Sequence, residues 1–314
     1  MSFIGFSGFL AIYQLVRGNE KTFNDALTEA RGRLLNSGAS DASRNTAAED
    51  LRRLPGSPEQ AQRVAAVLQA FLQEHTRPAA TPDSAAHRPC RNTGYVTPTY
   101  VSRALVVFGS VMRQVEGGGG IRLPDADLQG VEADTAGLEG ASFPGACLRG
   151  ASLNGVRMSG ADLTGAVVDS ASLRGSVLVG ASLPDASLVG TGLDGARLAG
   201  ARLTRADLTG ASLVGADLTL ALLAGATLDG ADLSGASLAC AYLEAVQLHD
   251  IQHWDEIRDF DGAYLFQAEG LPDGLRRLAV SRGAIETELS QEAWQERRSV
   301  CERRKRAAAA PRGG

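Results

Sequence analysis

The sequence predicts a β solenoid with four-sided coils over residues 121–250, preceded by an α-helical region and closed by a C-terminal cap and helix. Leucine or a similar apolar residue recurs at every fifth position from 123 to 248, which gives 26 units without an insertion or a slip. A small residue, usually alanine, stands two positions before most of these residues. Aromatic residues make up only 5% of the 314 residues, which is low for a conventional core.

A period of five fits neither the 3.6-residue repeat of a helix nor the two-residue repeat of a strand. In "ADLTG", Ala206 and Leu208 are two residues apart, so both point to one side of a strand, while Asp207 points to the other. Because five is odd, an uninterrupted strand would turn the next leucine outward. A bend after every fifth residue removes this conflict, and Gly210 suits such a bend because glycine tolerates unusual backbone angles.

Four bends of about 90° close a square coil of about 20 residues, and stacked coils lie about 4.8 Å apart through backbone hydrogen bonds. The 26 units then make about 6.5 coils, with leucines 20 residues apart stacked inside a narrow lumen. Asp185, Arg205 and Leu220 also occupy bends, so glycine is not obligatory there.

The A(D/S)LxG pattern of residues 121–250 closely resembles the pentapeptide repeat proteins. The resemblance implies a right-handed quadrilateral β-helix. More loosely, the run ending in "VLQAFLQEH" and the segment "YVSRALVVFG" are similar to the leading region of many actinobacterial members. Some members of the family resemble duplex DNA in shape and charge, and bind DNA gyrase. The chain departs from those members because about 120 residues precede the rod and no loop interrupts it.

The amino-terminal segment, residues 1–19, contains an apolar run of about 14 residues. A membrane span needs roughly 20. A packed amphiphilic helix is our first interpretation, with a short membrane anchor through residues 1–16 or a cleaved signal as the alternatives. The basic residues and cleavage site of a signal are not evident. We expect a cytoplasmic protein, or one associated with a membrane through this segment.

Helical periodicity extends over residues 20–116, where apolar residues recur at i, i+3, i+4 and i+7. Ser57 and Gln60 predict a capping box at the start of one of these helices. Residues 76–94 are rich in proline and polar residues and predict a loop. Residues 117–120 are four glycines and predict a linker.

An open solenoid exposes unpaired strand edges at both ends, and these need covers. We expect the helix over 98–115 to cover the first coil. Residues 251–284 regain aromatic side chains and predict a C-terminal cap, and residues 285–314 predict a charged helix and tail.

Net charge is −5 overall, which argues against general nucleic-acid binding. Fifteen acidic residues and seven arginines give residues 121–250 a charge of about −8. The four cysteines contain no CxxC motif and predict free thiols in a reducing compartment. They are Cys90, Cys147, Cys240 and Cys301.

Several motifs match the patterns of cofactor or metal sites, but a structural role explains each of them better. "GTGLDG" at 190–195 matches a dinucleotide fingerprint, but the flanking repeats do not supply the strand and helix that it requires. His249 and His253 would share a metal only on a helix, and no third ligand has suitable spacing, so we expect them to pack in the cap. His87 and Cys90 stand in the loop without partners. We therefore predict no catalytic residue, no cofactor and no metal.

Acidic residues gather on one outward face, where Asp127, Asp169, Asp207 and Asp229 are opposed only by Arg149. Solvation of the solenoid accounts for such a pattern, but the same face is our candidate interaction surface. We expect a non-catalytic scaffold that binds an unknown protein partner. The alternatives are DNA mimicry directed at DNA gyrase, which resembles quinolone resistance, and a membrane-anchored accessory protein.

Overall fold

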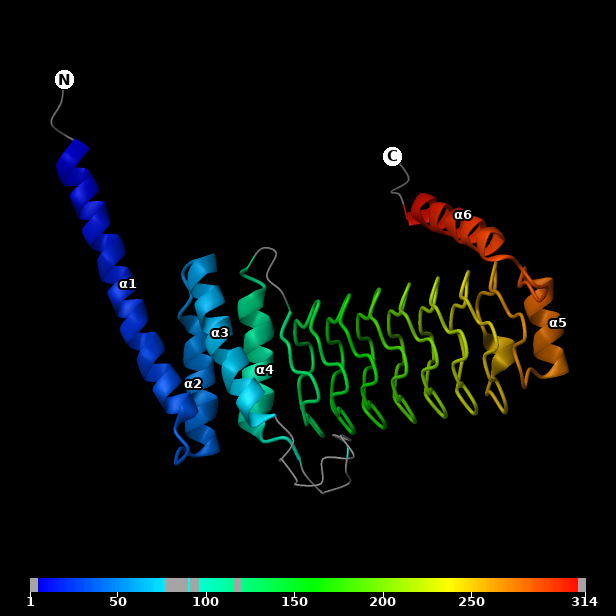
Figure 1. Ribbon diagram of the computed structural model, residues 1–314, viewed down its shortest axis with the longest axis horizontal. Helices are drawn as coiled ribbons and strands as arrows, with labels where there is room; N and C mark the ends of the chain where they lie inside the picture. The colour runs from blue at the N-terminus through cyan, green and yellow to red at the C-terminus, as the bar shows by residue number, and fades with distance from the viewer. Residues whose placement is uncertain (1–4, 77–89, 91–95, 116–119, 310–314) are drawn as a thin grey trace. The chain divides into compact units, whose positions relative to one another are not determined.

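A computed structural model of the chain describes residues 5–76, 90, 96–115 and 120–309 (Figure 1). The chain divides into two compact units. The first comprises Met1–His75 with Pro98–Gly118, and the second comprises Thr76–Thr97 with Gly119–Gly314.

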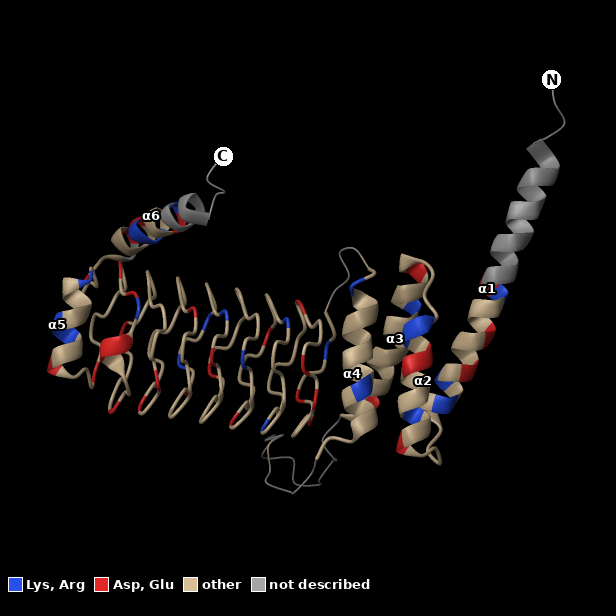
Figure 2. Ribbon diagram, turned by 180° about the vertical axis from the view of Figure 1, so that it is seen from behind, with Lys and Arg blue, Asp and Glu red and all other residues tan. Residues whose placement is uncertain are grey.

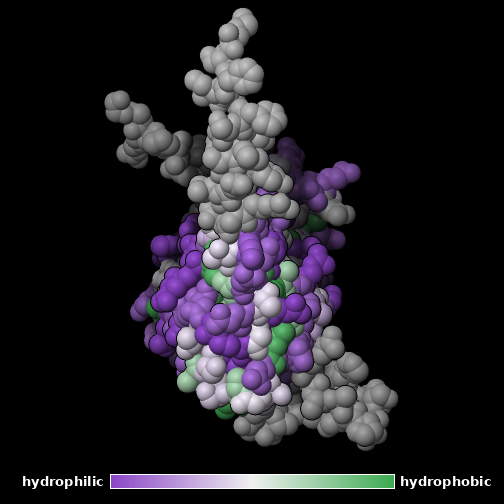
Figure 3. All heavy atoms as spheres, turned by 90° about the vertical axis from the view of Figure 1, so that its left-hand side faces the viewer, coloured by the Kyte–Doolittle hydropathy of each residue, from purple (hydrophilic) through white to green (hydrophobic). Residues whose placement is uncertain are grey.

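The first unit consists of helices. They are α1 (Gly5–Leu35), α2 (Asp41–Arg53), α3 (Pro58–His75) and α4 (Thr99–Met112). α4 packs against both α2 and α3, and α1 packs against α2. Phe71 and Leu105 are among the fully buried side chains of the core. The end view in Figure 3 shows a mostly hydrophilic outer surface with small apolar patches.

The start of α3 is capped by side chains. Ser57 Oγ accepts a hydrogen bond from the Gln60 backbone N–H at 3.2 Å, as the sequence predicted. The Gln60 side chain accepts in return from the Gly56 N–H at 2.8 Å, one residue earlier than a capping box requires. Within the described part of the chain, no helix combines the length and the apolar character needed to cross a membrane.

The second unit is a β solenoid. Parallel bridges join residues 20 apart, from Arg122 and Ser142 to Asp232 and Gln252, so each coil has four sides of five residues. We number the positions of each pentad 1 to 5, as in residues 206–210. Positions 1 and 3 face the lumen and are buried, and positions 2 and 4 face outward.

Position 5 forms the corner. Every fifth residue from Asp125 to Asp250 has a φ between 51° and 67°. Asp185, Arg205 and Leu220 adopt this left-handed conformation beside the glycines, as the sequence predicted. The alternation of inward and outward residues therefore restarts in the same phase after each corner.

Beyond Asp250 the ladder continues with a changed register. The bridge between Tyr242 and Tyr264 spans 22 residues, because the short helix η1 (Trp254–Glu256) lies in an insertion of two residues. The segment 251–284, for which we expected a cap, thus first adds further coil and then includes α5 (Asp273–Ser281).

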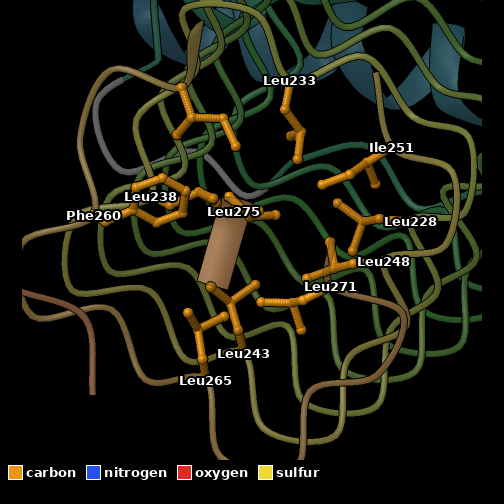
Figure 4. Close-up of a pocket in the computed structure, with 11 residues that line it drawn as sticks. Leu228, Leu233, Leu238, Leu243, Leu248, Ile251, Phe260, Leu265, Leu271 and Leu275 are labelled. Carbon is orange, nitrogen blue, oxygen red and sulfur yellow. The ribbon is translucent and has the colours of Figure 1, made fainter. Parts of the chain in front are cut away.

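The carboxyl end of the lumen is closed by α5. Leu275 of α5 points at the leucines of the last coils (Figure 4). The gap left among them is about 10 Å³ and is lined by apolar side chains alone. A space of this size is about that of one water molecule, so it is a packing defect rather than a ligand site.

One side of the amino edge of the solenoid is covered by residues that flank the predicted loop. The Asp127 N–H donates to the Thr76 carbonyl at 2.7 Å, and the Thr97 N–H donates to the Gln129 carbonyl at 2.8 Å. Backbone groups of the first coil are thereby paired, which protects the edge. Most of the loop, and the linker residues 117–119, lie outside the described residues.

The prediction of free thiols was wrong. Cys90 is bonded to Cys147 and Cys240 to Cys301, with Cα–Cα distances of 5.2 and 6.2 Å. Partners 57 and 61 residues apart meet because Cys90, which precedes the solenoid, lies against it and because α6 folds back onto it, and spacing in the sequence reveals neither contact. Disulfides are typical of proteins in oxidising compartments.

The terminal helix α6 (Gln291–Ala309) is attached to the last coils. The Trp294 ring lies 4.8 Å from that of Tyr242 and 5.5 Å from that of Tyr264, measured between centroids. The Cys240–Cys301 disulfide holds the same helix two turns further on. Aromatic residues therefore reappear where a helix has to be packed on the outside of the solenoid.

Candidate interaction surface

One backbone N–H takes no part in the ladder in each pentad whose position 4 is not proline. In residues 206–210 the N–H groups of positions 1, 2, 3 and 5 each donate to a backbone carbonyl. The position 4 N–H, here that of Thr209, has no backbone acceptor. Because this group lies on the outside of the turn, a side chain or water has to accept from it. The acceptor that each pentad provides therefore determines which outward side chains are engaged in hydrogen bonds within the protein.

Aspartate at position 2 caps the N–H of its own turn. Asp207 Oδ1 accepts from the Thr209 N–H at 3.0 Å and from the Thr209 hydroxyl at 2.5 Å. Asp127 accepts from the Gln129 N–H at 3.4 Å and from its side chain at 3.1 Å. The same local bond is made by Asp162, Asp217 and Asp232.

Aspartate at position 4 caps the N–H of the next coil, 20 residues on. Asp169 Oδ1 accepts from the Val189 N–H at 3.3 Å. Asp229 Oδ1 accepts from the His249 N–H at 2.9 Å and contacts its ring Nδ1 at 3.0 Å. These carboxylates therefore link neighbouring coils as well as carrying charge.

The structure brings the four acidic candidates to one side of the solenoid. Asp127 and Asp207 share one column of position 2, and Asp169 and Asp229 share the adjacent column of position 4. Arg149 pairs with Asp169 at 3.2 Å. Each of the four carboxylates is thus partly engaged within the protein, and each retains some exposure. Figure 2 shows acidic residues along the coils with fewer basic residues scattered among them.

Other charged residues pair between coils. Arg205 contacts Asp185 through two hydrogen bonds of 2.7 and 2.6 Å. The hydrogen bond from Arg205 lowers the pKa of Asp185, and the same bond raises the pKa of Arg205. Arg174 pairs with Asp194 at 2.7 Å. Such exposed pairs order the surface and contribute little stability.

The two histidines pair with aspartates of the preceding coil. His249 contacts Asp229, and His253 Nδ1 lies 3.3 Å from Asp232. Burial raises the pKa of Asp232, but hydrogen bonds from Ser234 and His253 together outweigh burial and lower it. Within the described residues, no three histidine, cysteine or acidic side chains are grouped to hold a metal ion. His87 lies outside the described residues.

The segment 190–195 forms solenoid corners. Gly190 and Gly195 both occupy position 5, each with a φ of 63°, and no helix follows them. The glycines of "GTGLDG" are therefore accounted for by the repeat.

Together these features define a β-solenoid repeat protein. A sequence model of the family described as pentapeptide repeats matches eight copies within residues 121–250. The matched ranges are 121–160, 136–168, 157–192, 186–223, 201–239 and 216–250. The chain belongs to the pentapeptide repeat family, whose fold is a right-handed β-helix and whose members are generally non-enzymatic structural or interaction proteins.

Solved structures of the same family resemble parts of the chain. Rfr23 from the cyanobacterium Cyanothece 51142 is 36% identical over 32% of this chain and 62% of its own, with a TM-score of 0.25. A pentapeptide repeat protein from Nostoc Pcc 7120 is 36% identical over 27% of this chain and 69% of its own, with a TM-score of 0.26. Full-length QnrB1, a plasmid-mediated fluoroquinolone resistance protein, is 19% identical over 51% of this chain and 86% of its own, with a TM-score of 0.27. No curated protein shows significant similarity to the chain.

Proposed function

We propose that this protein is a non-catalytic scaffold that binds a protein partner through the outward positions of its solenoid. One observation carries the proposal. Outward side chains stand in columns on a frame whose lumen is filled and whose backbone is hydrogen-bonded coil to coil. Such a frame presents side chains in fixed register, which lowers the entropy lost on binding.

The acidic face formed by Asp127, Asp169, Asp207 and Asp229 is one candidate contact. Each carboxylate uses lone pairs for an internal cap, yet its charge remains at the surface. Replacing aspartate by asparagine separates these roles, because the amide oxygen still accepts the turn N–H while the charge is lost.

We expect the four-fold variant Asp127→Asn, Asp169→Asn, Asp207→Asn and Asp229→Asn to lose partner capture while its melting temperature changes by only about 2 °C or less. The measurement is affinity capture with mass spectrometry on the full-length chain in a lysate of its own host. The matched control changes four aspartates on other sides: Asp162 and Asp217 cap their own turns, Asp134 caps the next coil, and Asp194 accepts from the Ser212 hydroxyl of the next coil. Equal capture by both variants and the unmodified protein would exclude this face as the contact.

DNA mimicry directed at DNA gyrase is the competing proposal from the family resemblance. The outward column that begins at Asp127 continues through Cys147, Val167 and Ser187 before it reaches Asp207, so it is not a continuous row of negative charge. The same captures distinguish the two proposals, because gyrase would be recovered as the partner. Inhibition of gyrase supercoiling at micromolar protein would favour DNA mimicry over the scaffold proposal.

We also propose a second contact region on the helical unit, where α1–α4 form their own core. The location of the protein is part of the proposal as well. Two disulfides favour an oxidising compartment over the reducing cytoplasm expected from the sequence.

A further inference from the structure

One corner of the solenoid lacks internal caps over four successive coils. The position 4 N–H groups of Glu139, Ser159, Val179 and Ala199 donate to no acceptor among the described residues. At this same corner the next coil is capped again, where Asp217 accepts from the Thr219 N–H at 3.1 Å. On the adjacent side of the solenoid, Thr204, Ala224, Glu244 and Phe266 form a run of the same length. We call Glu139, Ser159, Val179 and Ala199 the uncapped corner.

The missing caps follow directly from the sequence. Position 2 of these four pentads holds Gly137, Arg157, Val177 and Arg197, none of which has a carboxylate. Turn N–H groups in the capped pentads meet side chains on the outer surface, so by the repeat these four also point outward. They form a row of donors spaced by one coil, about 4.8 Å.

Two cations border this row without an ionic partner. Arg197 at position 2 and Arg202 on the next side are exposed, and neither has an acidic group within 4.0 Å among the described residues. Arg157 lies on the same side but is paired with Glu139 at 2.6 Å. Positive charge is thus left over at one place on a solenoid that is acidic as a whole.

The corner is also sterically open. A Cβ atom added to Gly160, Gly180 or Gly200 would meet no atom within 4 Å. A bound chain can therefore approach the row closely, and Val177 and Val179 offer it apolar contact.

We propose that the uncapped corner binds a short acidic peptide segment of a partner protein. Carboxylates of the segment accept hydrogen bonds from the Val179 and Ala199 N–H groups, in the place that Asp207 and Asp217 take in their own turns. Arg197 and Arg202 pair with its remaining carboxylates. A long polyanion such as nucleic acid would meet the surrounding acidic surface, whereas a short segment meets only the local positive charge. This inference rests on the proposed scaffold function and names the partner chemistry for one surface of it.

The test uses the full-length chain and a fluorescent peptide of eight aspartates, followed by anisotropy. Val177→Asp is expected to weaken binding at least about tenfold, because the new carboxylate caps the Val179 N–H and repels the peptide. Val167→Asp is the matched control, since it makes the same change at position 2 on another side. We expect its affinity to change less than about twofold.

A second variant tests the cations while it leaves the N–H row intact. Arg197→Gln with Arg202→Gln is expected to weaken binding by at least about tenfold and to reduce its dependence on salt. Equal effects of the two valine variants, or no binding by the unmodified chain, would overturn the inference. So would tighter binding of an eight-residue oligothymidylate than of the peptide. Partner capture by the acidic face is measured separately, so the scaffold proposal can stand when this inference fails.

Discussion

Replacing Leu223 by alanine is expected to lower the free energy of unfolding of the solenoid by about 2–5 kcal/mol. Leu223 is fully buried at position 3, stacked between the leucines of neighbouring coils. Because successive coils are held by hydrogen bonds about 4.8 Å apart, the lumen has little freedom to collapse around the missing atoms. Urea unfolding followed by circular dichroism measures the loss.

The adjacent residue provides the control. Leu222 has the same side chain at position 2, where it faces outward and is only half-buried. Leu222→Ala is expected to change the free energy of unfolding by about 1 kcal/mol or less. Equal losses for the two leucines would mean that the inward and outward positions are assigned wrongly.

Reducing the two disulfides is expected to lower the free energy of unfolding by about 2–4 kcal/mol for each bond. The bonds close segments of 57 and 61 residues, so their reduction greatly enlarges the unfolded ensemble. Cys240–Cys301 also retains α6, so its loss should release Trp294 from Tyr242 and shift the tryptophan fluorescence.

Thermal unfolding with and without a phosphine reductant measures this effect. Alkylation of the denatured protein before reduction provides an independent check, because all four cysteines are expected to resist modification. Four alkylated thiols in protein kept from reductants would restore the original prediction of free cysteines.

The architecture of the solenoid could be predicted because the repeat expresses it in every pentad. Ala206 and Leu208 stand two residues apart, and the odd period forces a corner at Gly210. The same reasoning allowed Asp185 and Arg205 to occupy corners, where both have positive φ. Local alternation and local backbone conformation were enough to place these residues.

Contacts between distant segments could not be predicted in this way. Cys147 and Cys240 stand at ordinary repeat positions, and their partners lie in a loop and on a terminal helix. The change of register after Asp250 left a signal in the sequence, because Ala263 and Leu265 are again two residues apart. The two-residue insertion at η1 shifts this alternation out of phase with the five-residue repeat of residues 121–250.

For the acidic face, the sequence predicted which side the residues share but not the hydrogen bonds that they make. Its residues could be assigned to one side by counting in steps of 20. Their caps required the turn geometry, which leaves the position 4 N–H without a backbone acceptor. A threonine two residues after an aspartate, as in Asp207 and Thr209, was the signal for the local cap.

We infer that position 4 N–H groups are either capped within the protein or left free for a partner. Residue-resolved amide hydrogen exchange by NMR distinguishes the two kinds of group. The amides of Thr209 and Thr219 are expected to exchange slowly, and those of Val179 and Ala199 to exchange much faster in the free protein. Equally slow exchange at all four would contradict the account, because it would show that the uncapped corner already has its acceptors.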